Sequence, residues 1–342
     1  GGSLAEYLLD VTNPDFTEAA QIEVILSAWK SNALEDHIGV EPPHIDAELP
    51  RTLARRSVGT QFAILLKRLA KMTLRDPTLY SARWAFALLA CTVFAVTYFR
   101  ARERVQSQVI PRIFLLVWSF GAPAFMSVVV IAVYSSDFHV YLKEVRNGQY
   151  GPVAYMFAQK AIMVPCLLGL SLFALLPLYA VVGYSWQGAL GIWLAHAAVM
   201  LFSECLAQLL AVCFGHFLIG MVAYVGISFV LYLHCGTLVD VSSVVLPLRW
   251  IHHVDPWNLG LRAMVRFDFE HQVFQGFGGH GELCGRAPRL CLGRDGADVL
   301  DNLGFALSGF SADVHPWANI GRVVGLALAL TAVQYVVVVR AR

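Results

Sequence analysis

Six apolar segments, each about as long as the hydrocarbon core of a bilayer is thick, constrain this sequence of 342 residues more than any other feature. They comprise residues 84–99, 113–134, 155–182, 189–214, 217–239 and 320–339. A transmembrane helix needs about 20 mostly apolar residues, because a helix in lipid must satisfy every backbone polar group by itself. Hydrophobic residues make up 57% of the chain and charged residues only 14%, unlike a soluble domain. The sequence therefore predicts an all-α membrane protein with six transmembrane helices.

The positions of the lysines predict how these helices are oriented. Lys30, Lys67 and Lys71 precede the first segment, and Lys143 and Lys160 lie around the connection between the second and third segments. Basic residues near the ends of spans are retained in the cytoplasm, so we expect these regions and both termini to be cytoplasmic. Three arginines in the loop after the first segment oppose this orientation. The net charge of +1 speaks against a nucleic-acid partner. We expect a multi-pass protein of the plasma membrane or an internal membrane.

Residues 51–75 combine a basic face with an apolar stripe at helical spacing. The stripe contains Phe62, Leu65, Leu66 and Leu69, and several arginines and lysines lie beside it. Such a helix lies in the headgroup plane of the inner leaflet, attracted by anionic lipids. The alternative is an ordinary cytosolic helix packed on a neighbouring domain. Asp76-Pro77 predicts the end of this helix just before the first span.

A second amphipathic element is predicted between the second and third spans. Residues 137–146 alternate charged and apolar side chains, and Asn147-Gly148 then predicts a turn. A short cytoplasmic helix of this kind suits the docking of a soluble partner domain. The charged residues of this element are Asp137, Lys143, Glu144 and Arg146.

Together these pieces resemble the membrane half of G-subfamily (White-type) ABC transporters. Residues 4–10 resemble the segment that follows the nucleotide-binding domain in that family, and Arg75-Asp76-Pro77 resembles the end of its connecting helix. Lys143-Glu144, Asn147-Gly148 and Tyr150 resemble its coupling element, with Lys143 in place of an arginine. In the last loop, Gly236, Pro247, Trp250, Asp255-Pro256 and Trp257 resemble its re-entrant elements, with Asp255 where the family usually has serine.

The resemblance implies a domain organisation. Residues 1–50 would be the tail of a nucleotide-binding domain and a linker, residues 51–77 the amphipathic connecting helix, and residues 78–342 the ABC-2 type transmembrane domain. Its large external loop, with re-entrant helices, would span about residues 240–316. A cytoplasmic coupling helix would join the second and third spans.

No phosphate-binding Gly-x-x-x-x-Gly-Lys-(Ser/Thr) motif and no Leu-Ser-Gly-Gly signature occur in the sequence. We therefore expect the chain to have no cofactor of its own and not to hydrolyse ATP alone. The resemblance implies that ATP and Mg²⁺ bind a nucleotide-binding domain upstream in the same protein. It also implies that a second half-transporter, identical or different, completes the assembly.

The function implied is the ATP-driven export of lipids, sterols or lipophilic xenobiotics by alternating access. One alternative is an ABC-2 permease for a polysaccharide or another polymer, against which residues 247–257 and the long last loop argue. The other alternative is an intramembrane protein outside the ABC class, such as a scaffold, a channel or an enzyme.

The resemblance also implies that the second and fifth spans line an apolar substrate path. The residues assigned to the path are Phe114, Leu115, Trp118, Ser119, Phe229, Leu231, Tyr232 and Leu233. Thr237 and Leu238 stand where some relatives carry a Leu-Leu plug at the outer exit. A largely apolar cavity suits flat lipophilic cargo, although such a stripe also occurs in simple helix packing.

Glu204 is a carboxylate predicted deep in the fourth span, where an ionised group costs about 3 kcal/mol on insertion scales. His196 and Gln208 lie eight residues before it and four after it, broadly on the same helix face. One interpretation is a polar relay or a substrate contact. The other is a protonated glutamic acid that joins two helices by a hydrogen bond, or one that reaches headgroup water.

Two cysteines, Cys284 and Cys291, lie in the polar last loop and could form a disulfide if this loop faces an oxidising compartment. Two free thiols are the alternative. The histidines, including His252 and His253, lack the spacing of a zinc site and are expected to be solvated or interfacial, so no metal site is predicted.

Overall fold

The computed structural model describes residues 23, 24, 27, 57–75, 80–239, 243–270, 272–275, 292–306 and 315–341. The chain divides into two compact units, Gly1–Arg55 and Arg56–Arg342, and the fold below is that of the second unit. Nearly all of residues 1–50 and both Cys284 and Cys291 lie outside the described residues. The predictions made for the linker and for the disulfide therefore stay predictions.

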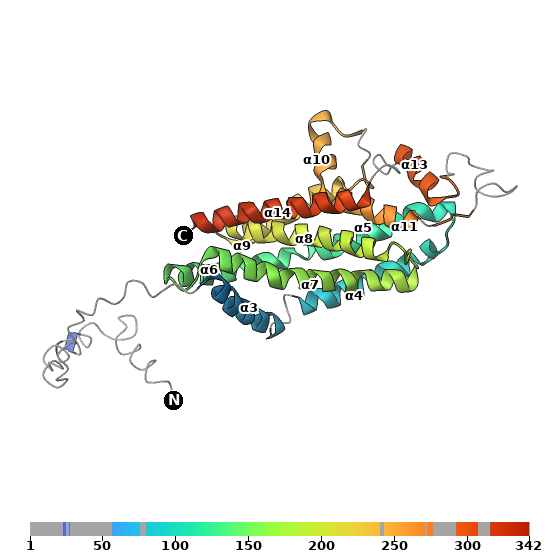
Figure 1. Cartoon of the computed structure of the whole chain (residues 1–342). Coiled ribbons are helices and arrows are strands. Elements are labelled where there is room, and N and C mark those ends of the chain that lie inside the picture. The colour runs from blue at the N-terminus through green and yellow to red at the C-terminus, as the bar shows by residue number, and fades with distance from the viewer. Residues whose placement is uncertain are drawn as a thin grey trace. The chain divides into compact units, whose positions relative to one another are not determined.

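Long apolar helices packed side by side form a bundle (Figure 1). In chain order they are α4 (Ser81–Thr97), α5 (Val109–Phe125) followed by α6 (Val128–Arg146), α7 (Pro152–Val181), α8 (Ala189–Cys213), α9 (Phe217–Leu233) and α14 (Pro316–Arg340). No β-strand occurs among the described residues, which contain two isolated bridges, Val105 with Gln275 and Val273 with Asp295.

Four helical stretches are long and apolar enough to cross a membrane, namely Gln106–Arg146, α7, α8 and α14. α4 and α9 are apolar but have 17 residues each, which is about 25 Å at 1.5 Å per residue, against a hydrocarbon core of about 30 Å. These elements coincide with the six apolar segments of the sequence. The prediction of an all-α membrane protein is confirmed.

The second predicted span is interrupted between α5 and α6. Pro123 lacks a backbone N–H, and after it the N–H groups of Ser127, Val129 and Val130 bond to the carbonyl three residues back instead of four. The Tyr224 hydroxyl of α9 donates to the Ala124 carbonyl oxygen at 2.6 Å. The irregular backbone is therefore satisfied by a side chain of a neighbouring helix, as a lipid environment requires.

The predicted short coupling helix is not a separate element. Residues 137–146 form the last turns of α6, because no glycine or proline interrupts the chain after Val128. The helix ends only at Asn147 and Gly148, and Gly148 has a φ of 72°, which favours glycine. The predicted turn is thus confirmed, and the coupling segment belongs to α6, the helix that begins after the break in the second span.

The two ends of the bundle carry different elements (Figure 1). α3 (Val58–Arg75) lies at the end that also holds the last turns of α6 and the C-terminus. The opposite end carries α11 (Pro256–Phe269), α13 (Gly296–Ala306) and the 3-10 helices η1 (Phe99–Arg102) and η2 (Gln106–Gln108). η4 (Leu246–Leu248) leads into α10 (Arg249–Val254), which stands off the bundle.

α8 is the central helix of the bundle and packs against α14, α11, α6, α7 and α9. α11 approaches it closely because glycine leaves room at two contacts. A Cβ on Gly260 would lie 2.2 Å from Cγ2 of Val199, and a Cβ on Gly191 would lie 2.5 Å from the ring of Phe267. Larger residues at either glycine would push the helices apart.

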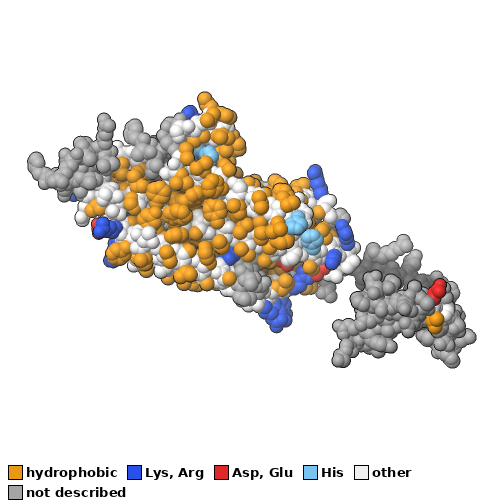
Figure 2. Space-filling model, turned by 180° about the vertical axis from the view of Figure 1, so that it is seen from behind, with side chains coloured by type: hydrophobic (Ala, Val, Ile, Leu, Met, Phe, Trp, Pro, Cys, Tyr) orange, Lys and Arg blue, Asp and Glu red, His pale blue; other side chains and the backbone are white. Residues whose placement is uncertain are grey.

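Apolar side chains cover the flank of the bundle, whereas lysines and arginines gather mainly toward its ends (Figure 2). α9 shows this most clearly, because only Gly220, Tyr224 and Ser228, spaced four residues apart, are buried on it. Its remaining surface is apolar and includes Phe229, which is 61% exposed. Such a helix suits lipid or a partner helix.

Candidate functional site

Three side chains join α3, the end of α6 and the start of α7. Arg68 of α3 donates to both carboxylate oxygens of Glu144, at 2.7 and 2.9 Å. The Tyr150 hydroxyl donates to Oε2 of Glu144 at 2.5 Å, and the guanidinium of Arg68 lies 5.9 Å from the centre of the Tyr150 ring. The backbone N–H of Gly151 donates to Oε1 of Gln61 at 2.9 Å. A force applied to Glu144 would therefore reach both α3 and α7.

This contact is charged and partly exposed, since the side chains of Arg68 and Glu144 are 40% and 20% accessible. The hydrogen bond to Glu144 raises the pKa of Arg68. Burial, and then the hydrogen bond to Glu144, raise the pKa of Tyr150, so its hydroxyl remains a donor at physiological pH. Solvent screens an ion pair at this exposure. The bidentate geometry therefore fixes the relative orientation of the two side chains more than it contributes to stability.

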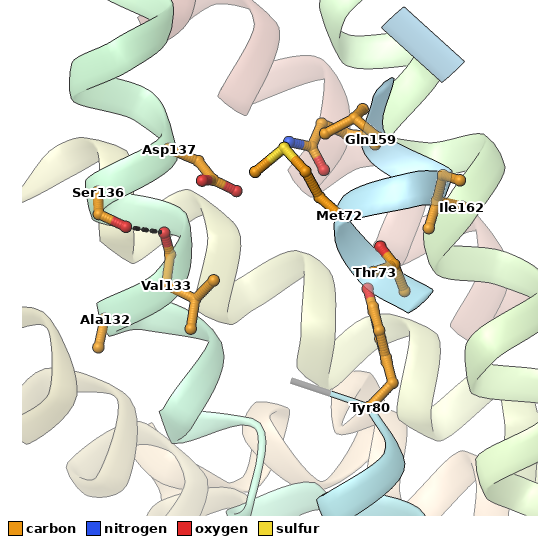
Figure 3. Close-up of a pocket in the computed structure, with 10 residues that line it drawn as sticks. Met72, Thr73, Tyr80, Ala132, Val133, Ser136, Asp137, Gln159 and Ile162 are labelled. Atoms are coloured by element: carbon orange, nitrogen blue, oxygen red, sulfur yellow. Dashed lines mark hydrogen bonds between the residues drawn. The ribbon is translucent and has the colours of Figure 1, made fainter. Parts of the chain in front are cut away.

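The other residues assigned to coupling lie apart from this contact. Lys143 and Arg146 are exposed at the end of α6, and Gly148 forms the turn. Asp137 lies seven residues before Glu144, in a cavity of about 380 Å³ between α3, α6 and α7. Its carboxylate points into this space toward Met72 (Figure 3). The cavity also borders Tyr80, where the chain enters α4, so a movement of α3 relative to α6 would change its shape.

Glu204 forms a buried ion pair with Arg83. Arg83 Nη2 lies 2.9 Å from Oε2 of Glu204 and also donates to Oγ of Ser127 at 2.9 Å, and Nη1 donates to Oε1 at 3.3 Å. The side chains of Arg83 and Glu204 are 4% and 0% accessible. The ion pair thus joins α4, α8 and the break between α5 and α6. Glu204 therefore does not reach headgroup water, and its side chain faces the guanidinium of Arg83.

Arg83 was missed by the sequence analysis because it directly precedes the first apolar segment. The signal available was the carboxylate itself, since a charge predicted at this depth needs a cationic partner. His196 and Gln208 do not join Glu204. His196 Nε2 lies 3.1 Å from the carbonyl oxygen of Ser119, and Gln208 accepts from Lys160 Nζ at 2.6 Å. A relay of these three residues, one of the two interpretations of the sequence, is therefore not formed among the described residues, which also hold no metal-type cluster of His, Cys, Asp or Glu.

The residues assigned to the substrate path divide into accessible and buried sets. Leu115, Ser119 and Thr237 are buried, because Leu115 and Ser119 lie on the inner side of α5 and the Ser119 carbonyl faces α8. These three side chains are not accessible to cargo in this conformation of the single chain, and their assignment to the path stays a prediction. The accessible or half-buried members are Phe114, Trp118, Phe229, Leu231, Tyr232, Leu233 and Leu238.

An aromatic cluster links α5, α9 and α11. The ring centre of Tyr232 lies 5.9 Å from that of Trp118, 6.0 Å from that of Phe125 and 6.3 Å from that of Trp257. Phe120 and Phe125 also meet the Trp257 ring edge to face, at 5.8 and 5.4 Å. Trp257 is 1% exposed, so this residue of the predicted external loop belongs to the core. The cluster holds α9 against α5 and α11 at Tyr232, three residues after Phe229.

Polar residues close the bundle just beyond α9. Arg262 Nη2 lies 2.7 Å from Nε2 of His252, and Arg262 Nε donates to Oδ1 of Asn258 at 2.9 Å. His252 Nδ1 lies 3.2 Å from the His234 carbonyl oxygen. His252 is 2% exposed, so the expectation of a solvated or interfacial histidine is wrong here. Gly236, at a φ of 92°, lets the chain turn against Asn258.

Asp255 caps α11. Its Oδ1 accepts from the backbone N–H of Trp257 at 2.9 Å, which is the role that serine commonly has at a helix N-terminus. Burial raises the pKa of Asp255 well above its usual range. Aspartate at position 255, where the resemblance noted from the sequence implies a serine, therefore preserves the N-cap of α11.

A second buried ion pair, between Arg112 and Asp268, fastens the opposite end of the bundle and was not foreseen from the sequence. Arg112 Nε donates to Oδ2 of Asp268 at 2.6 Å, and Nη1 donates to the Ala101 carbonyl oxygen at 3.1 Å. The backbone N–H of Ser185 donates to Oδ1 of Asp268 at 2.9 Å. The pair holds together η1, α5, the connection from α7 to α8, and α11.

Comparison with known proteins gives consistent matches. Residues 60–267 match the model of the ABC-2 type transporter family. ABC transporter G family member 23 of Arabidopsis thaliana is 24% identical over 268 residues, which are 77% of this chain and 40% of the relative. Member 41 of Oryza sativa subsp. japonica is 24% identical over 213 residues, 58% of this chain and 14% of the relative. Member 40 of the same organism is 23% identical over 267 residues, 75% of this chain and 18% of the relative. The chain thus spans less than half of the length of these relatives.

Proposed function

Because the chain belongs to the ABC-2 type transporter family, we propose that it is the membrane half of an ATP-driven exporter of lipids, sterols or other lipophilic compounds. In this proposal a nucleotide-binding domain supplies ATP and Mg²⁺, and a second half-transporter, identical or different, completes the path. The end of the bundle that carries α3 is cytoplasmic, and so are the termini.

The observation that carries the proposal is that α5 and α6 follow one another along the stretch Gln106–Arg146, with a single break between them. This stretch bears Trp118 of the aromatic cluster in its first half and Glu144 of the charged contact near its end. A nucleotide-driven push at Glu144 would therefore move the wall that faces the cargo. The break at Ser127, held by Arg83, supplies the place where the two halves of the stretch can change their angle.

The cargo side of the proposal rests on the surface of α9. Phe229 is 61% exposed on α9, three residues before Tyr232 of the aromatic cluster, and apolar rings offer contact area and stacking faces to flat lipophilic molecules. With a second half-transporter facing it, this surface would form one wall of a slit. Lipid packing alone would also cover such a surface, so a functional test is needed.

Replacing Phe229 by alanine should alter cargo recognition. Loss of about 60 Å² of apolar contact at about 25 cal/mol per Å² weakens binding by about 1.5 kcal/mol, or roughly tenfold. The measurement is the concentration of a sterol or lipophilic dye that half-maximally stimulates the ATPase of the assembled transporter. Folding and basal ATPase should change little, because Phe229 makes no large buried contact.

The control is Phe86→Ala, since Phe86 is 37% exposed on α4 and takes part in none of the ring contacts of the aromatic cluster. Phe94 is unsuitable as a control because its ring packs on Trp118 at 5.5 Å. If Phe229→Ala and Phe86→Ala shift the stimulation equally, or if neither shifts it, α9 does not line the path.

A further inference from the structure

A groove on the flank of the bundle lies between α7, α8 and α14. It has a volume of about 500 Å³ and is largely apolar. Phe157 and Leu328, on its two sides, are 66% and 62% exposed, so the groove opens toward the surrounding lipid. The floor residue Leu201 comes from α8. The groove lies apart from the aromatic cluster and from the Arg68–Glu144 contact, and neither part of the proposed transport mechanism uses it.

One charged side chain, Lys160, lines this groove. Its ammonium donates to Oε1 of Gln208 at 2.6 Å and lies 3.5 Å from Sγ of Cys205, which in turn lies 3.5 Å from the Thr331 hydroxyl. No carboxylate of the described residues lies within 4.0 Å of it.

The two buried arginines of the bundle, by contrast, each have a carboxylate. A cation in an apolar groove is costly unless a charge of opposite sign compensates it.

The side chain of Lys160 can reach the level of the lipid headgroups. α7 has 30 residues, about 45 Å at 1.5 Å per residue, so about 15 Å of it extends beyond a hydrocarbon core of about 30 Å. Lys160 is the ninth residue of α7, counted from the end at which α3 lies. A helix centred in the bilayer would place its backbone a few ångströms inside the hydrocarbon boundary, within reach of a phosphate for a lysine side chain.

We propose that this groove binds one anionic phospholipid of the leaflet that contacts α3. The acyl chain would lie along the apolar walls, and the headgroup phosphate would receive the ammonium of Lys160. The Thr331 hydroxyl lies 3.5 Å from Sγ of Cys205, which the Lys160 ammonium also contacts. A net negative headgroup is preferred to phosphatidylcholine, because the choline of the latter already neutralises its own phosphate. This site is independent of the proposed cargo path.

The test is native mass spectrometry of the purified protein in detergent, titrated with dioleoyl phosphatidylserine or dioleoyl phosphatidylcholine. We expect the wild type to retain one phosphatidylserine in preference to phosphatidylcholine. Lys160→Gln, which can still bond to Gln208, should lower that preference by about fivefold. Lys160→Arg should preserve it. Ala332→Phe, which fills the groove without removing the charge, should lower the retention of both lipids.

Lys67→Gln is the control for general electrostatic attraction, because Lys67 is exposed on α3 outside the groove. A wild-type preference in Lys160→Gln, or an equal loss in Lys67→Gln, would overturn the proposal. The same holds if Ala332→Phe converts a dimer into a monomer without changing lipid retention, since the occupant would then be a second copy of the chain. Melting temperatures near that of the wild type in Lys160→Arg and Lys160→Gln would show that both variants fold.

Discussion

Replacing Arg83 by alanine should destabilise the membrane bundle by about 3–5 kcal/mol. The substitution leaves the carboxylate of Glu204, which has no accessible surface, without a counter-charge and removes a donor to Ser127. Thermal unfolding of the detergent-solubilised protein, followed by tryptophan fluorescence or by the monodisperse fraction after heating, measures the effect. Glu204→Ala should be similarly harmful, because the guanidinium would then be buried alone.

The double substitution Arg83→Met with Glu204→Leu distinguishes the ion pair from simple packing. Removing both charges eliminates the uncompensated group, so the double variant should regain much of the stability that each single variant loses. Arg68→Ala is the exposed comparison, since that side chain is 40% accessible, and it should change stability by about 1 kcal/mol or less. Additive losses in the double variant would contradict the ion pair.

Replacing Glu144 by alanine should uncouple ATP hydrolysis from transport in the assembled protein. The variant loses two hydrogen bonds from Arg68 and one from Tyr150, which together join α3, α6 and the start of α7. An ion pair at this exposure contributes about 1 kcal/mol. If this free energy is lost from the coupling step, cargo-stimulated ATPase should fall roughly fivefold. ATP binding should stay at the wild-type level, because the nucleotide site lies on another domain in the proposal.

Arg68→Ala should reproduce this defect, whereas Lys67→Ala, at the exposed neighbouring position on α3, should not. The measurement is ATPase activity with and without cargo at equal expression, together with nucleotide binding. Normal stimulation in Glu144→Ala would show that the charged contact does not transmit force.

Hydropathy alone predicted where the membrane helices lie, because a long apolar segment in lipid has few alternatives to a helix. It did not place their interruptions. The break at Ser127 follows Pro123 and is joined to α9 by Tyr224, whose hydroxyl donates to the Ala124 carbonyl oxygen from 100 residues away in the sequence. The coupling segment was predicted as a short amphipathic helix. It continues α6 because the sequence has no glycine or proline between Val128 and Arg146 that would end the helix.

The pairing of buried charges could not be predicted in the same way. Glu204 was identified as an anomaly from the sequence, but its partner Arg83 lies 121 residues away. Whether the two side chains meet depends on how α4 and α8 are rotated about their axes. The same limit explains why the residues assigned to the path include both accessible and buried positions of α5, since one helix face cannot be distinguished from another until the neighbours of α5 are known. The resemblance to G-subfamily transporters, in contrast, rested on local motifs and is confirmed by the family match.

ATP-dependent movement of a fluorescent sterol in proteoliposomes is the most direct measurement of the proposed function. The chain should be reconstituted together with its nucleotide-binding domain, with ATP and Mg²⁺ supplied on the side of α3. We expect sterol to move away from that side only when hydrolysable ATP is present, and to stop when a non-hydrolysable analogue replaces it. Equal movement with and without ATP, in protein that is shown to hydrolyse ATP, would contradict the assignment as an exporter of lipophilic cargo.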